Sequence, residues 1–464
     1  MKRKRRPAAR RRGARAAAGR RGLSRRDFVK AAATLAAAGA LPASCGGEKR
    51  KAPARAKKAL KILQWSHFVP GYDRWFDGVF TREWGERNGT EVIVDHVSAT
   101  EVNARGAAEA AAGKGHDLLL FQSPPASYED RVIDHREILE AVARRHGAPI
   151  DLARRSSVNP RTGRAFAFVD SFVPDPGNYR IDLWGEAGYP NGPDTWEDLR
   201  AGGRRIRETR GIPAGIGLSP EQDSNMALRA LLWSFGGAEQ DGNGAVVINS
   251  KETVEALAFA RALYREAMTP EVFTWDPSSN NRMILSGRSS FVQNAISVTR
   301  SGEKENPDLT RRIGLCPPLA ARRRLASAHL TNCYVIWKFA DNREGASQFL
   351  VDLMDAFARV FEESEFYNFP CYPSTVPDLE ARLAADRKGE PRGKYRILAR
   401  AFDWSVNVGF PGYATAPIDE VFQTFLIPNA FARVARDDLT PAEGARLLER
   451  ELARVFGRWR AGAA

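Results

Sequence analysis

The sequence predicts an α/β protein built on an open parallel sheet, and three observations near its start support this fold class. Apolar, extended segments occur at 60–65, 91–94 and 118–121, each with the length and composition of a strand. Between them, residues 72–87 and 102–112 carry apolar side chains at helical spacing. The third strand, Leu-Leu-Leu-Phe, is apolar on both faces, as parallel strands are. This β-α-β-α-β order predicts helices on both faces of the sheet.

The loops that leave the first and third strands are the first candidates for a ligand site. In open parallel sheets the ligand binds outside the carboxyl ends of the strands. The two loops are residues 66–68 and 122–124, and they place Trp65, His67 and Ser123 at or beside the strand ends. For His67, a histidine satisfied within its own loop is the alternative interpretation.

Later segments carry the signals that start helices. Thr195 precedes a helical pattern and has Asp198 three residues on, where a carboxylate favours the positive end of the helix. Residues 249–252 and 440–443 carry the same kind of helix-start signal. The segment 440–443 also has a proline in the first turn of its helix. We expect a helix after each of these starts.

The positive charge of the chain is concentrated in its first residues. The 464 residues have a net charge of +14, and residues 1–44 hold fourteen Lys and Arg against the single acid Asp27. The remainder therefore carries only +1, which argues against a nucleic-acid-binding protein. Its roughly 420 residues suffice for two ordinary domains, and none of its apolar runs reaches the length of a membrane helix.

Residues 1–45 have the organisation of an export signal. A Ser-Arg-Arg-x-Phe-x-Lys motif at 24–30 precedes an Ala-rich apolar run and a small-residue site. The motif resembles the twin-arginine type of signal. Cys45 resembles the acylated cysteine of a bacterial lipoprotein, although Leu41 stands one place too early; a plain cleavage near Ala43 is the alternative. Residues 46–58 then form a flexible tether.

Three cysteines follow the signal, at positions 316, 333 and 371, and none belongs to a CxxC pair. An oxidising compartment would permit one disulfide and one free thiol. Three buried thiols are the alternative, because a twin-arginine substrate folds before export.

Four stretches, in this order, resemble the family 1 extracellular solute-binding proteins, the substrate-capturing lipoproteins of ABC importers, mostly for sugars. They are 186–199 (EAGYP…PDTWEDL), 231–250 (LLWSFGG…DG…NS), 333–353 (CYVIWK and the helix after it) and the helix that begins near Thr440. The resemblance implies a periplasmic-binding-protein-like fold of type II, with two α/β lobes joined by crossing strands. It implies a monomer without cofactor or metal, a permease partner, and membrane contact through the lipid only.

The same resemblance divides the chain between the lobes. Residues 59–168 with 294–345 would form the N-terminal lobe, and residues 169–293 with 346–464 the C-terminal lobe. The crossings would lie near 168–171, near 291–294 and in the helix after Gly345. The family's usual residues are replaced at 178–181 and at 294–295, which leaves open a ligand other than a common sugar.

A sugar site needs polar side chains around aromatic platforms, because sugars offer both hydroxyls and C–H faces. For each aromatic residue, core packing is the alternative interpretation. The candidates at predicted cleft edges are Trp65, His67, Ser123, Asp170, Trp233, Trp275, Gln293, Asn294, Asn332, Tyr367, Tyr372 and Tyr413.

Signals for catalysis are weak. The histidines show no metal-ligand spacing, and the sequence has no P-loop, nucleophile elbow or strand-linked GxGxxG. Residues 301–304 match SxxK but lack its partner motifs. We therefore expect a receptor that makes and breaks no bond. An exported glycan-acting enzyme and a lipid-anchored envelope scaffold are the alternatives.

Overall fold

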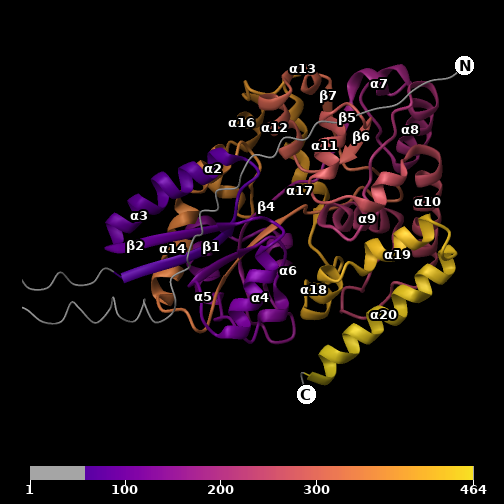
Figure 1. The fold of residues 1–464 in the computed structure, drawn as a ribbon. Helices are drawn as coiled ribbons and strands as arrows, with labels where there is room; N and C mark the ends of the chain where they lie inside the picture. Colours follow the sequence, from indigo (N-terminus) through magenta and orange to yellow (C-terminus); the bar gives the residue numbers. More distant parts are fainter. Residues whose placement is uncertain (1–57, 463–464) are drawn as a thin grey trace, which may run out of the picture. The chain divides into compact units, whose positions relative to one another are not determined.

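The computed structural model describes residues 58–462. The predicted export signal, Cys45 and the tether up to residue 57 lie outside the described residues. The α/β fold class is confirmed, because the described chain contains a mixed six-stranded sheet, an antiparallel three-stranded sheet and a two-stranded pair, with helices packed around them (Figure 1).

The first sheet has six strands in the order β10-β4-β9-β3-β1-β2. Its parallel part is the predicted one: β1 pairs in parallel with both β2 and β3. Strand β9 runs antiparallel between β3 and β4, and β10 is antiparallel to β4. The strands are β1 (Lys58–Trp65), β2 (Thr90–Val97), β3 (Leu118–Phe121), β4 (Phe168–Phe172), β9 (Thr331–Ile336) and β10 (Phe369–Pro370).

Helices cover this sheet, and glycines end two of them. Gly89 and Gly113 take left-handed φ values of 58° and 63° after α3 and α4. The predicted helix at 72–87 contains a π-helical turn, η1 (Phe76–Phe80), and Phe76 and Phe80 both contact Phe349. The helices are α2 (Pro70–Trp75), α3 (Thr81–Asn88), α4 (Val102–Ala112), α5 (Arg136–His146), α6 (Asp151–Ser157), α14 (Arg343–Asp355) and α15 (Phe357–Glu363).

The second sheet has three strands in the order β6-β5-β7. They are β5 (Gly177–Arg180), β6 (Phe291–Gln293) and β7 (Ile313–Cys316), and both outer strands are antiparallel to β5. Its region contains α7 (Ile181–Glu186), α8 (Trp196–Arg210), α9 (Gln222–Phe235), α10 (Lys251–Ala267), η3 (Pro270–Thr274), α11 (Ser279–Leu285), α12 (Ser297–Glu305) and α13 (Pro307–Thr310). The last part of the chain adds α16 (Leu379–Ala384), η5 (Lys394–Arg400), α17 (Ala401–Trp404), α18 (Ala416–Gln423), α19 (Leu426–Ala435) and α20 (Pro441–Gly462).

The predicted helix starts are confirmed. Thr195 accepts a hydrogen bond from the backbone N–H of Asp198, whose carboxylate accepts one from the N–H of Thr195, which completes a capping box. Ser250 caps α10, and Thr440 exchanges the same pair of bonds with Glu443 ahead of α20.

Two segments cross between the sheets side by side. Residues 173–176 join β4 to β5, and residues 328–330 join the short strand β8 (Ala326–Ser327) to β9. Strand β8 pairs with β11 (Ser405–Val406). The N–H of Val173 donates to the oxygen of Leu330, and the N–H of His329 donates to the oxygen of Val173, each at 2.8 Å. The two crossings are therefore tied to each other by their backbones.

Strand pairing differs from the predicted division at two places. β7 pairs with β5 and so extends the second sheet, although residues 294–345 were assigned to the first lobe. β10 pairs with β4 and α14 packs on α5, although residues 346–464 were assigned to the second lobe. The chain thus returns to the first sheet at residues 328–330, whereas the predicted division has it return at residue 294. The lobe boundaries themselves stay a prediction.

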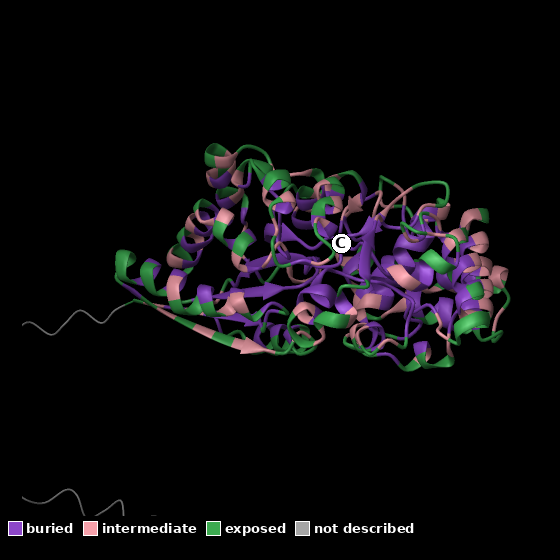
Figure 2. Cartoon of the chain, turned by 90° about the horizontal axis from the view of Figure 1, so that it is seen from above, coloured by how far each residue is buried: buried purple, intermediate pink, exposed green. Residues whose placement is uncertain are grey.

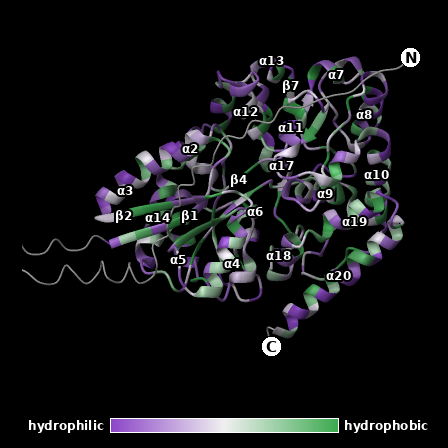
Figure 3. Ribbon diagram, in the orientation of Figure 1, coloured by the Kyte–Doolittle hydropathy of each residue, from purple (hydrophilic) through white to green (hydrophobic). Residues whose placement is uncertain are grey.

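Buried residues fill the sheets and the helix faces that cover them (Figure 2). The strands are largely hydrophobic, and polar residues alternate along the outer faces of the helices (Figure 3). Within residues 58–462, no helix combines the length and the apolar character needed to cross a membrane.

Candidate functional site

The crossing segments place His329 between two carboxylates. Its Nδ1 lies 3.2 Å from Oδ1 of Asp175, and its Nε2 lies 3.1 Å from Oδ1 of Asp223 in the first turn of α9. Burial opposes the charged imidazole, but the charge of Asp223 and the bonds to both carboxylates outweigh it and raise the pKa of His329 to about 10. His329 is therefore a buried imidazolium at neutral pH.

Amide side chains surround these carboxylates. Nε2 of Gln293 donates to Oδ2 of Asp175 at 3.0 Å, and Nδ2 of Asn280 donates to Oδ2 of Asp223 at 2.5 Å. Asn294 donates to the same oxygen of Asp223 at 3.4 Å. The predicted site residues Gln293 and Asn294 thus lie together, at the end of β6.

Glu221 adds a third carboxyl group beside Asp223. It caps α9 by accepting the backbone N–H groups of Asp223 and Ser224, at 2.6 and 2.5 Å. Burial, and then the charge of Asp223, raise the pKa of Glu221 to about 8. At neutral pH its carboxyl group is therefore largely protonated.

Aromatic rings form a second group at the end of β1. The ring of His67 stacks on Trp65, with centroids 4.9 Å apart, and lies 4.7 Å from the ring of Tyr72. Burial lowers the pKa of His67 to about 4, so its imidazole is neutral. Its Nδ1 accepts the N–H of Val69 at 2.9 Å, which leaves Nε2 to donate to Oδ1 of Asn368 at 3.2 Å.

Tyr367 connects the two groups. Its ring meets His67 edge-on at 5.1 Å. Burial, and then the charges of Asp223 and Asp175, raise the pKa of Tyr367. Its hydroxyl is fully buried and forms no hydrogen bond of good geometry among the described residues, although Ser297 lies close enough to lower its pKa.

Further buried polar atoms near these groups lack a partner within residues 58–462. Such an atom costs about 1–3 kcal/mol if nothing satisfies it, so each one calls for a bound molecule or water. They include both side-chain polar atoms of Gln64, Nε1 of Trp65, Nε2 of Gln122, Oδ1 of Asn178, Oε1 of Gln293, Oγ1 of Thr331 and Oδ1 of Asn332. Gln64, Gln122 and Asn332 share one edge of the first sheet, because β9 begins where β3 ends.

Asp170 lies at an irregularity in β4, where the pairing with β9 shifts between Val169 and Ser171. Its Oδ1 accepts the hydroxyl of Ser171 at 2.7 Å, and Ser171 in turn accepts Nδ2 of Asn332 at 2.9 Å. Burial raises the pKa of Asp170 to about 7. Asp170 and Asn332, both predicted site residues, are thus joined through Ser171.

Trp233 and Trp275 lie in packed surroundings. Nε1 of Trp233 donates to Oε2 of Glu239 at 3.0 Å, and the residue stands ten positions along α9 from Asp223, or about 15 Å. The ring of Trp275 fills the space beside Gly215, where a Cβ atom would meet it at 2.6 Å. Neither ring shows a contact that links it to His329.

The other three predicted residues make no hydrogen bond, ion pair or ring contact with His329 in the described chain. Ser123 accepts Nε2 of Gln423 at 3.1 Å. Tyr372 is fully buried and stacks on Phe168 at 6.2 Å. Tyr413 is half-buried, and the guanidinium of Arg154 lies 5.3 Å from its ring centre. Their roles in binding stay predictions.

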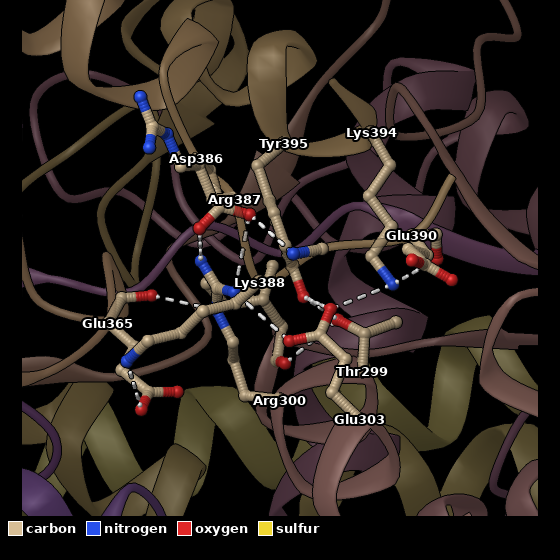
Figure 4. Close-up of polar contacts among 12 residues, drawn as sticks. Thr299, Arg300, Glu303, Glu365, Asp386, Arg387, Lys388, Glu390, Lys394 and Tyr395 are labelled. Carbon is tan, nitrogen blue, oxygen red and sulfur yellow. Dashed lines mark hydrogen bonds and ion pairs between the residues drawn. The ribbon is translucent and has the colours of Figure 1, made fainter. Parts of the chain in front are cut away.

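A buried charged network holds the turn that precedes Tyr367 (Figure 4). Glu365 and Phe366 take left-handed φ values of 53° and 72°, which side chains rarely adopt. Nε of Arg300, on α12, donates to the backbone oxygen of Glu365 at 3.0 Å. The same guanidinium pairs with Glu303 at 3.0 Å and Asp386 at 3.3 Å. The network thereby fixes the direction in which Tyr367 leaves the turn.

A cavity of about 620 Å³ lies elsewhere, at the amino end of β1. Lys58, Lys61, Asp117 and Asn342 line it, among others. These residues stand at the opposite end of β1 from Trp65, so this cavity is not the candidate site.

Sequence reasoning missed Asp175, Asp223 and His329 as site residues. Their positions are far apart in the chain, and only the crossing of the segments brings them together. One local signal could have marked Asp175: it stands between Pro174 and Pro176, which favour an extended chain. Nothing local distinguishes His329 or Asp223.

Residues 69–351 match the sequence model of the family described as "Bacterial extracellular solute-binding protein". This match covers more than half of the chain. The chain belongs to the bacterial extracellular solute-binding protein family. The resemblance inferred from the four sequence stretches is thereby confirmed, and family membership makes the chain a solute-binding protein.

Similar proteins agree with this family. A Deinococcus radiodurans protein named "Probable ABC transporter-binding protein" is 28% identical over 144 residues, which are 30% of this chain and 34% of that protein. This chain spans about a third to two fifths of the length of the curated relatives it matches.

Solved structures show the same fold. Maltose-bound MalE3 of T. maritima matches with a TM-score of 0.71 at 19% identity, over 86% of this chain and 99% of that one. A sugar transporter protein of Arthrobacter chlorophenolicus A6 with bound laminaribiose matches with a TM-score of 0.69 at 13% identity, over the same shares of the two chains. The predicted fold of type II periplasmic binding proteins is confirmed.

Proposed function

We propose that this protein is the extracytoplasmic receptor of an ABC importer and that it captures a sugar or short oligosaccharide. Family membership supports solute capture, and the relative from Deinococcus radiodurans supports the importer. The sugars bound in the similar structures support the ligand class. The partner would be the membrane permease, and the receptor would act as a monomer without cofactor or catalysis.

One observation of this chain carries the ligand class. Partnerless buried polar atoms accompany the stacked rings of Trp65 and His67 and the hydroxyl of Tyr367. Sugars satisfy both features at once, because their hydroxyls form hydrogen bonds and their C–H faces pack on rings. Closure around such a ligand by hinge motion fits the crossing segments that join the sheets.

We further propose the predicted route to the site of action. The twin-arginine signal at 24–30 would direct export of the folded chain, and acylation of Cys45 would anchor it outside the cytoplasmic membrane. Replacing Arg25 and Arg26 by lysines should stop export, and Cys45→Ser should release the exported protein from membranes. A Cys45→Ser protein that stays membrane-bound would contradict the anchor.

The function is tested by thermal unfolding of the protein with sugars, polyols and oligosaccharides. A ligand that binds only the folded state raises the melting temperature in a saturable way. Recovery of the ligand unchanged supports the receptor, whereas its conversion would favour the glycan-acting enzyme. If no saccharide shifts the melting temperature, the carbohydrate proposal fails and the envelope scaffold becomes the better hypothesis.

A further inference from the structure

We infer that the site discriminates by charge, favouring a saccharide with a protonated amine and rejecting saccharides with a carboxylate or phosphate. The inference rests on the proposed function, because it concerns the same site. It is carried by two features: the charges buried around His329, and the acceptor oxygens that Gln293, Asn178 and Asn332 leave without partners.

The charges around His329 do not balance. Its imidazolium supplies one positive charge, and Asp175 and Asp223 supply two negative ones, so the trio carries −1. Among the described residues, no Lys or Arg pairs with either carboxylate. The three buried arginines of the described chain are engaged elsewhere, Arg180 with Asp182, Arg229 with Glu239, and Arg300 with Glu303 and Asp386.

The amide groups repeat this polarity. Because the carboxylate of Asp175 can only accept, Gln293 must direct its NH₂ group there, and its Oε1 is left without a partner. Asn178 donates its NH₂ group to the backbone oxygen of Asn294 at 2.8 Å, and its Oδ1 is likewise partnerless. Both side chains are buried, so each leaves an acceptor that needs a donor.

The same polarity recurs at the edge of the first sheet. Ser171 donates to Asp170, so it must accept from the NH₂ group of Asn332. Oδ1 of Asn332 is then the atom left over, and it is again an acceptor. In the part of the chain that the structure describes, Asp170 also has no ion-pair partner, and with a pKa of about 7 its carboxyl group is only about half ionised at pH 7.

A protonated amine suits both features, since it offers three donors, no acceptor and a positive charge. A carboxylate or phosphate offers only acceptors, which cannot pair with these three oxygens, and it adds negative charge. The partnerless donors of Gln64, Trp65 and Gln122 could pair with such a group, so the charge around His329 decides the preference. At an effective dielectric constant near 20, a unit charge about 8 Å from the site changes affinity by on the order of tenfold or more. Neutral sugars have hydroxyls that both donate and accept hydrogen bonds. Their affinities should therefore lie between those of the amine and the acid.

The test is calorimetric titration of the full chain at pH 7 with matched triplets of ligands. Glucosamine, glucose and glucuronate form one triplet; the β1,4-linked glucosamine disaccharide, cellobiose and cellobiouronic acid form another. We expect the amine to bind at least about tenfold more tightly than the neutral sugar, and the acid at least about tenfold more weakly. An acid that binds as tightly as its neutral parent overturns the inference while leaving the proposed function intact. No binding by any of these ligands contradicts both.

Two variants with opposite effects on charge sharpen the test. Asp175→Asn removes a negative charge and should reduce the preference for amine over neutral sugar about tenfold, whereas His329→Gln removes the positive charge and should increase it. Asp308→Asn serves as the control, because its exposed carboxylate is screened and should leave the ratio unchanged. Equal ratios in all four proteins would overturn the inference. If one variant fails to fold, titration of the wild-type protein with the two ligand triplets still tests the inference.

Discussion

The guanidinium of Arg300 lies over the ring of Tyr395, 3.8 Å from the ring centre. This contact joins α12 to η5, and the hydroxyl of Tyr395 adds a hydrogen bond of 2.7 Å to Glu303. Lys394 pairs with the same oxygen of Glu303, Oε1, at 2.9 Å. The arrangement is buried, so its charges depend on one another for compensation.

Arg300→Met should therefore lower the free energy of unfolding by about 3–5 kcal/mol, because it leaves Asp386 without its buried cation and leaves Glu303 with Lys394 alone. Arg311→Met is the matched control. Arg311 also pairs with two acids, Asp308 and Glu390, at 2.8 Å each, but its side chain is 56% exposed. Its loss should cost at most about 1 kcal/mol. Denaturant unfolding measures both, and equal losses would show that burial of the network adds no stability.

Trp233→Ala should destabilise the empty protein by about 3–5 kcal/mol, as truncation of a buried aromatic residue does. If Trp233 instead contacts the ligand, as its place among the candidates at predicted cleft edges suggests, the substitution should weaken ligand binding and leave the melting temperature of the empty protein unchanged. The bond from Trp233 to Glu239 and its 1% exposure now favour a packing role. Thermal unfolding without ligand distinguishes the two expectations. An unchanged melting temperature would favour the ligand-binding role over the packing role.

Stability should fall between pH 8 and pH 10 because of His329. Its pKa in the folded protein, about 10, lies above the ordinary value of 6.5. The stabilisation is therefore complete below pH 6.5 and is lost as the pH rises through 10. Glu221, with a pKa of about 8, is about half ionised where this window begins, so the slope near pH 9 to 10 is the part that reports His329.

His329→Gln should flatten the dependence of unfolding free energy on pH between 8 and 10. His135→Gln provides the comparison, because burial lowers the pKa of His135 to about 4 and the residue is neutral throughout the window. Parallel slopes in the wild type and His329→Gln would rule out titration of His329 there.

Thiol reagents should not react with the native Cys45→Ser protein. Cys316, Cys333 and Cys371 are all buried and unpaired, and burial raises the pKa of Cys316 to about 12. After unfolding without reductant, we expect all three thiols to react. A single reactive thiol in the unfolded protein would instead indicate the disulfide that the sequence left open.

Local patterns account for what the sequence could predict. The parallel pairing of β1 with β2 and β3 follows from apolar strands alternating with helices, and the cap at Thr195 follows from its spacing to Asp198. The return of the chain at 328–330 and the pairing of β7 with β5 depend on contacts between distant segments. Gln293 and Asn294 could be predicted from the family resemblance. His329 could not, because its surroundings exist only after folding.

The direction of β1 has a practical consequence for biosensor measurements. The strand enters the sheet at Lys58 and ends at Trp65, and its eight residues span about 26 Å. A capture tag placed ahead of residue 58 would therefore be attached at the sheet edge remote from Trp65 and His67. Immobilisation through that end should leave ligand access unhindered, so affinities measured on a surface should equal those measured in free solution.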